Sequence, residues 1–137
     1  MDALVMHRYP VRKALEGRET GLGAHLDLGF TTILLTDGTE GLQVCRDKGK
    51  PEGEREWVAV SPQAPGTFVL NFGRLLETIT KGKCQAVLHR VVNVAEKERK
   101  SVAFFADPSA DARVGRAGLN YAQYFAATST TFKKLAK

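Results

Sequence analysis

The 137-residue chain is poor in cysteine: it contains only Cys45 and Cys84, which lie far apart in the sequence. Two separated cysteines suggest neither a disulfide framework nor a paired zinc motif, so we expect a reduced, cytoplasmic protein. No apolar run approaches the length that spans a bilayer, and the N-terminus lacks a basic region followed by a long apolar run. We therefore expect neither secretion nor membrane insertion.

Basic residues are spread over several segments, and of these the tail 132–137 contains lysines and no acid. The net charge is +5, but acids are interspersed in the basic segments 46–56 and 96–100. No aromatic residues alternate with a basic stripe to offer stacking platforms for bases. A solvated surface accounts for this pattern better than a nucleic-acid interface, so we expect no nucleic-acid partner.

Short apolar stretches separated by turn signals predict a single all-β domain over residues 1–137, built as a sandwich or barrel. The expected strands cover residues 3–9, 23–28, 31–36, 41–46, 56–60, 67–72, 86–92 and 101–106. Two segments break this pattern. A short helical turn is expected over 74–82, and apolar residues at helical spacing predict a C-terminal helix over 120–137.

The chain has three histidines, and two of them suggest a metal site. Side chains at i and i+2 of a strand point to the same face, so His25 and Asp27 are expected to converge. His89, on another expected strand, is the natural third member. Two imidazoles and one carboxylate leave coordination positions open, which is typical of non-haem Fe(II) oxygenases. Alone the spacing is weak, because histidines are more often packed or solvated than metal ligands.

Arg99 and Ser101 repeat the same spacing before an apolar strand. An arginine with a hydroxyl beside it is a receptor for carboxylates, because the guanidinium binds both oxygens of a carboxylate at once. The alternative is a surface arginine within a basic run.

The motifs "YP", "HLD", "GLQV", "LHRV" and "RKS" follow one another in an order that resembles the catalytic core of the isopenicillin N synthase-like, Fe(II)/2-oxoglutarate-dependent dioxygenases. The resemblance covers nearly the whole chain, from about Leu4 onward. It implies that the iron ligands are His25, Asp27 and His89. It also implies that Arg99 and Ser101 hold the distal carboxylate of 2-oxoglutarate.

Two residues near the N-terminus also enter this comparison. Tyr9, just before Pro10, resembles a family tyrosine that reaches the same carboxylate, and the alternative is an ordinary strand aromatic. His7 would share its strand face and line the pocket, although a packed or surface histidine is the commoner case. Arg74 follows Gly73 where the family commonly has an acid, which leaves the hydrogen bonding of that loop open.

The resemblance also implies a fold and a reaction. The fold is the double-stranded β-helix, a jelly roll that holds the metal at its open end. The cofactors are Fe(II), the cosubstrate 2-oxoglutarate and dioxygen. The expected enzyme is an oxidoreductase that hydroxylates or otherwise oxidises a small-molecule substrate and releases succinate and carbon dioxide.

Three alternatives stay open. The chain could be a related oxidase that omits 2-oxoglutarate, or a non-catalytic metal- or ligand-binding β-module, and zinc, nickel or cobalt could occupy the same ligands.

Family members normally carry an N-terminal region that packs against the core, and we expect this chain to be a fragment, a truncated product or a minimal version. Uncovered apolar surface would then favour a homodimer.

Overall fold

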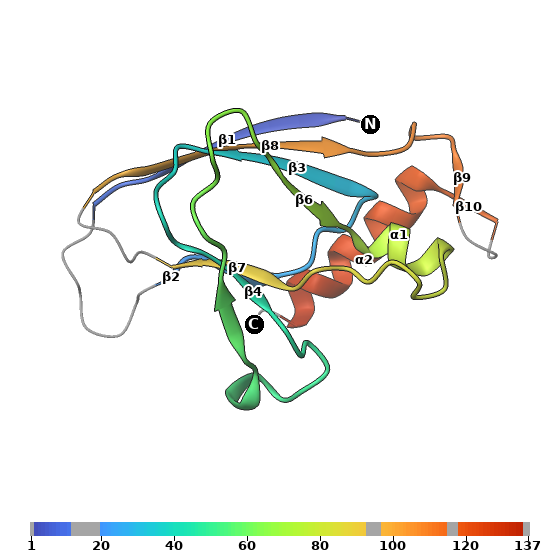
Figure 1. Cartoon of the computed structure of the whole chain (residues 1–137). Helices are drawn as coiled ribbons and strands as arrows, with labels where there is room; N and C mark the ends of the chain where they lie inside the picture. Colours follow the sequence, from blue (N-terminus) through green and yellow to red (C-terminus); the bar gives the residue numbers. More distant parts are fainter. Residues whose placement is uncertain (1, 12–19, 93–96, 115–117, 136–137) are drawn as a thin grey trace.

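The structure, a computed structural model, describes residues 2–11, 20–92, 97–114 and 118–135. Two four-stranded antiparallel sheets face each other (Figure 1). In spatial order, sheet A contains β1 (Ala3–Tyr9), β8 (Arg99–Ala106), β3 (Thr31–Thr36) and β6 (Val69–Phe72). Sheet B contains β2 (Thr20–His25), β7 (His89–Val92), β4 (Leu42–Cys45) and β5 (Trp57–Ala59). This is the expected jelly-roll arrangement.

Alternation along the strands places one face of each sheet in the core. In β3, Thr32 and Leu34 are buried whereas Ile33 and Leu35 are exposed. The same period of two buries Arg99, Ser101 and Ala103 on β8, as expected for a sheet with one covered face. The apolar part of this core is formed by Tyr9, Leu34, Leu42, Val91 and Ala103. Polar residues of the candidate site therefore share the inner face with the core.

Smaller elements lie at one end of the two sheets (Figure 1). They are α1 (Arg74–Ile79), β9 (Arg113–Val114), β10 (Leu119–Asn120) and α2 (Tyr121–Leu135). Leu75, Val114 and Tyr121 form a second buried cluster against Phe30 and Tyr124, and this cluster joins α1, β9 and α2. A 3₁₀ turn, η1 (Glu52–Glu54), lies in the loop before β5. Among the described residues, no helix is long and apolar enough to cross a membrane.

Each expected strand and both expected helical segments have a counterpart in the structure. The predicted bounds of one strand are wrong, and the error concerns a residue of the site. The strand expected over 23–28 is β2, which ends at His25. Asp27 lies in the segment that crosses from sheet B to β3 of sheet A. The backbone of this crossing segment bonds to the start of α1, because the Arg74 N–H donates to the Asp27 carbonyl oxygen at 2.8 Å and the Leu75 N–H to that of Gly29 at 3.0 Å. The loop that contains Arg74 in place of an acid is thus held by main-chain bonds.

Close approach of two chain segments explains the glycine at position 73. A Cβ atom there would overlap the carbonyl oxygen of Gly29 and lie 3.2 Å from that of Asp27. The Gly73 N–H also donates to the Phe30 carbonyl oxygen at 2.9 Å. The segment that carries Asp27 is therefore fixed against the beginning of α1.

Candidate active site

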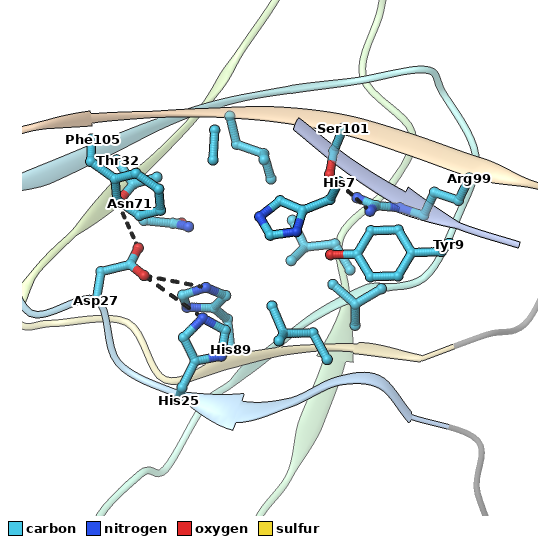
Figure 2. A pocket seen from close by; sticks show the side chains of 15 residues that line it. His7, Tyr9, His25, Asp27, Thr32, Asn71, His89, Arg99, Ser101 and Phe105 are labelled. Atoms are coloured by element: carbon cyan, nitrogen blue, oxygen red, sulfur yellow. Dashed lines mark hydrogen bonds and ion pairs between the residues drawn. The ribbon is translucent and has the colours of Figure 1, made fainter. Parts of the chain in front are cut away.

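His25 and His89 face each other across neighbouring strands. The antiparallel register pairs His25, the last residue of β2, with His89, the first residue of β7. Their ring centroids are 4.2 Å apart. Asp27 Oδ1 lies 3.7 Å from His25 Nε2 and 3.9 Å from His89 Nε2. One ligand atom from each of the three residues lies within 4.8 Å of the others, a spacing that one metal ion can bridge (Figure 2).

Hydrogen bonds fix the orientation of both imidazoles. His25 Nδ1 lies 2.8 Å from the Gly23 carbonyl oxygen, and His89 Nδ1 lies 2.9 Å from that of Val87. A carbonyl oxygen only accepts, so each Nδ1 carries the proton and each Nε2 offers its lone pair. Burial lowers the pKa of His25, and the nearby His89 lowers it further. Both effects favour the neutral imidazole, which is the form that binds metals.

Asp27 is buried, with 8% of its surface exposed. Its Oδ2 accepts a hydrogen bond from the Thr32 hydroxyl at 2.6 Å, while Oδ1 is directed toward the two histidines (Figure 2). A buried carboxylate needs such partners, because removing a charge from water without compensation is costly. The convergence of Asp27 with the histidines comes from the chain crossing after β2, and not from strand alternation as the sequence suggested.

A basic and hydroxyl-rich group lies on the inner face of sheet A. Arg99 is buried, and its Nε donates to the Thr39 carbonyl oxygen at 3.3 Å while Nη1 donates to Ser101 Oγ at 3.3 Å. Its guanidinium carbon lies 5.2 Å from the centroid of the Tyr9 ring, which the β1–β8 register places opposite it. Arg99 Nη2 is buried and has no hydrogen-bond partner among the described residues.

Burial shifts the pKa values of both Arg99 and Tyr9. It lowers the pKa of the Arg99 guanidinium, although nearby Tyr9 and Asp37 oppose the shift, and an arginine stays charged at any physiological pH. Burial also raises the pKa of Tyr9, against the opposing influence of Arg99 and Ser101, so its phenol keeps a proton to donate. A buried cation with an unused N–H, beside two hydroxyls, is a site for a carboxylate.

One pocket between the sheets contains both groups (Figure 2). Its lining includes every residue that the sequence suggested for the site, together with other polar residues on the inner face: His7, Thr32 and Asn71. His7 therefore lines the pocket. Sequence reasoning did not place Thr32 or Asn71 in the site. The signal for Thr32 was present, because alternation in "TTILLT" places its hydroxyl on the same face as Leu34.

The donor set fits the cofactors that the motifs imply. Two neutral imidazoles and one carboxylate oxygen suit a facial iron site with open positions. The unpartnered Arg99 Nη2 supplies the donor that an anionic cosubstrate such as 2-oxoglutarate requires. The donor groups for the metal and for the cosubstrate all belong to side chains of this chain.

Comparison with known proteins agrees with this chemistry. The model of the family described as the 2OG-Fe(II) oxygenase superfamily matches residues 1–108. The chain is 43% identical over 97 residues to Protein DMR6-LIKE OXYGENASE 1 of Arabidopsis thaliana, covering 71% of this chain and 26% of that protein. A 2-oxoglutarate-dependent dioxygenase of Didymella fabae is 39% identical over 109 residues, covering 78% of this chain and 31% of that protein.

The fold has solved counterparts. The full-length Neurospora crassa T7H, in a crystal structure with alpha-KG, superposes with a TM-score of 0.79 over 96% of this chain and 44% of that one. At 22% identity this likeness concerns the fold. The chain spans about a quarter to a third of the length of the curated relatives that it matches. From the match over residues 1–108 and the site geometry, the chain belongs to the 2OG-Fe(II) oxygenase superfamily.

Proposed function

We propose that this chain forms the catalytic core of an Fe(II)- and 2-oxoglutarate-dependent oxygenase that oxidises a small organic metabolite. The observation that carries the proposal is the convergence of three ligand atoms within 4.8 Å, each on a side chain whose other polar atom is already hydrogen bonded. The family match and relatives named as oxygenases support the same reaction class.

The residues divide into two groups. His25 Nε2, His89 Nε2 and Asp27 Oδ1 would hold Fe(II), which when bound supplies dioxygen activation coupled to the decarboxylation of 2-oxoglutarate to succinate. Arg99 would bind the distal carboxylate through Nη2, with Ser101 and Tyr9 donating to the same group. Anchoring both ends of the cosubstrate in a buried pocket restricts its orientation, which is a large part of the advantage of a bound reaction.

The test is an anaerobic equilibrium dialysis with Fe(II), followed by calorimetric titration with 2-oxoglutarate. His89→Ala is expected to lose tight metal binding. Arg99→Ala is expected to retain the metal and to weaken 2-oxoglutarate binding by roughly 30-fold or more, because the buried partner of a carboxylate is removed. The matched control is Arg90→Ala, since Arg90 lies over the Trp57 ring at 4.1 Å and does not line the pocket.

The outcomes separate the remaining alternatives. A folded chain that binds Fe(II) but not 2-oxoglutarate would favour an oxidase in which Arg99 receives the substrate's own carboxylate. A folded chain that binds no Fe(II) would contradict the oxygenase. Metal and 2-oxoglutarate binding without succinate formation under air would favour a binding module.

We further propose that copies of this chain associate through the outer face of sheet A. Large apolar side chains lie there on all four strands, and they are Leu4, Met6, Ile33, Leu35, Leu70 and Phe104. The register places Leu4 beside Phe104, Phe104 beside Ile33, and Ile33 beside Leu70, so they form a continuous row across the sheet. Contiguous exposed apolar surface of this kind is typical of interaction sites.

A further inference from the structure

Thr32 is a buried hydroxyl in the middle of sheet A. It is 4% exposed, and β3 pairs it with Asn71 on one side and Phe105 on the other. The two flanking ladders fix its backbone, and a β-branched side chain has few accessible rotamers in such a setting. Its hydroxyl is therefore held in place before any ligand binds.

The Thr32 hydroxyl bonds to only one of the two carboxylate oxygens of Asp27, a proposed metal ligand. It donates to Asp27 Oδ2 at 2.6 Å, whereas both histidine Nε2 atoms are closest to Oδ1 (Figure 2). The two carboxylate oxygens of Asp27 thus have different tasks. The Asp27 main chain is also anchored, because its carbonyl oxygen accepts from the Arg74 N–H at 2.8 Å. The main-chain bond fixes the point from which the side chain extends, and the Thr32 bond opposes the rotation that would exchange its two oxygens.

Fe(II) bound there would take two imidazole nitrogens and one carboxylate oxygen from this chain, and its other coordination positions would remain for external ligands. The 2-oxo acid group of 2-oxoglutarate can offer two oxygens, and dioxygen would need a position as well. A carboxylate that binds through both oxygens would occupy one of these positions. The number of available positions therefore depends on keeping Asp27 Oδ2 away from the metal.

We propose that Thr32 is a positioning residue that restricts Asp27 to coordination through Oδ1 and thereby keeps a chelating position open for the 2-oxo acid group. This inference rests on the proposed function and deepens it. Hydrogen bonds to metal-ligating carboxylates orient the ligand and tune the site in this way.

The experiment compares Thr32→Val, which removes the hydroxyl at nearly the same volume, with Thr32→Ser, which retains it. Affinities for Fe(II), for 2-oxoglutarate and for glutarate are measured without oxygen. Glutarate has the same two carboxylates but lacks the 2-oxo group, so it isolates the contribution of chelation. We expect Thr32→Val to retain Fe(II) binding within a few-fold and to lose roughly 10-fold or more of its preference for 2-oxoglutarate over glutarate, with Thr32→Ser close to the unmodified chain.

Other results would overturn the inference. If the Fe(II) affinity of Thr32→Val falls by roughly 10–100-fold while the 2-oxoglutarate preference is unchanged, the hydroxyl serves only to hold the ligand for the metal. Equal affinities in all three proteins would show that it has no part in coordination. Failure of the unmodified chain to bind Fe(II) would instead remove the proposed function, and this inference with it. Circular dichroism establishes that each variant is folded.

Discussion

Buried polar atoms at the two ends of the pocket differ in how they are satisfied. At the metal end, His25 and His89 donate to backbone carbonyls and Asp27 accepts from Thr32. At the other end, Arg99 Nη2 has no partner among the described residues. A buried charged donor without an acceptor lowers stability unless a ligand supplies the acceptor. The Arg99 end is therefore suited to binding an anion, and not to stabilising the fold.

Tyr9 permits a test of this difference at the level of one atom. Tyr9→Phe removes the hydroxyl and retains the ring beneath the Arg99 guanidinium. We expect the affinity for 2-oxoglutarate to fall by roughly 10–100-fold, because one hydrogen bond to a charged group is lost. Fe(II) affinity is expected to stay the same, and the free energy of unfolding to change by less than about 1 kcal/mol.

Calorimetry measures the affinities of Tyr9→Phe for 2-oxoglutarate and Fe(II), and urea denaturation measures its free energy of unfolding. Tyr124→Phe is the matched control, since Tyr124 lies on α2 and packs against Tyr121 away from the pocket lining. An unchanged 2-oxoglutarate affinity in Tyr9→Phe would assign Tyr9 to the core cluster alone, where it also packs.

At the scale of elements, strand register brings the site together. The β2–β7 pairing sets His25 opposite His89, and the β1–β8 pairing sets Tyr9 opposite Arg99. A shift of one residue in either pair would turn these side chains to the other face of the sheet. Only Asp27 depends on something else, which is the contact of the crossing segment with the start of α1.

Gly73→Ala tests that contact. The added Cβ would overlap the Gly29 carbonyl oxygen, so the crossing segment and α1 must separate. We expect the free energy of unfolding to fall by about 1–3 kcal/mol, as for overpacked sites, and Fe(II) affinity to fall because Asp27 moves with its segment. Gly53→Ala in η1 is the control, because no heavy atom lies within 4 Å of the position that its added methyl group would take. Denaturation and metal dialysis are the measurements; a variant as stable and metal-competent as the control contradicts the argument.

The elements also explain which features the sequence could reveal. Period-two alternation located the longer strands, and residue type with spacing singled out His25, His89, Arg99 and Ser101, which line one pocket in the structure. The position of Asp27 was misassigned to a strand, because the end of β2 is determined by distant backbone bonds to Arg74 and Leu75 that leave no local pattern. The β9–β10 pair was missed because strands of two residues are too short to show a period.

For the whole molecule, the two faces of sheet A differ in composition. The inner face combines the core with Arg99, Ser101 and Thr32. The outer face is largely apolar, with Arg8 opposite Lys100 at one end, and has no covering layer among the described residues. On this face, Met6 is 77% exposed and Leu4 is 65% exposed. Such exposure is unfavourable in water, because apolar area that could be removed from solvent remains hydrated. Association through this face would bury it and leave the pocket on the opposite side of the sheet unobstructed.

Sedimentation equilibrium tests the proposed association, using the 15.0 kDa chain over a range of concentrations. We expect the average mass of the unmodified chain to rise with concentration, and Leu70→Glu to shift it toward the monomer, since burying an unpaired charge in an apolar interface is costly. Phe125→Glu is the matched control, because Phe125 is 44% exposed but lies on α2. A monomer at every concentration, or an equal effect of both substitutions, would contradict an interface on sheet A. Retained Fe(II) binding in Leu70→Glu would show that the two faces act independently, as the alternation of inward and outward side chains requires.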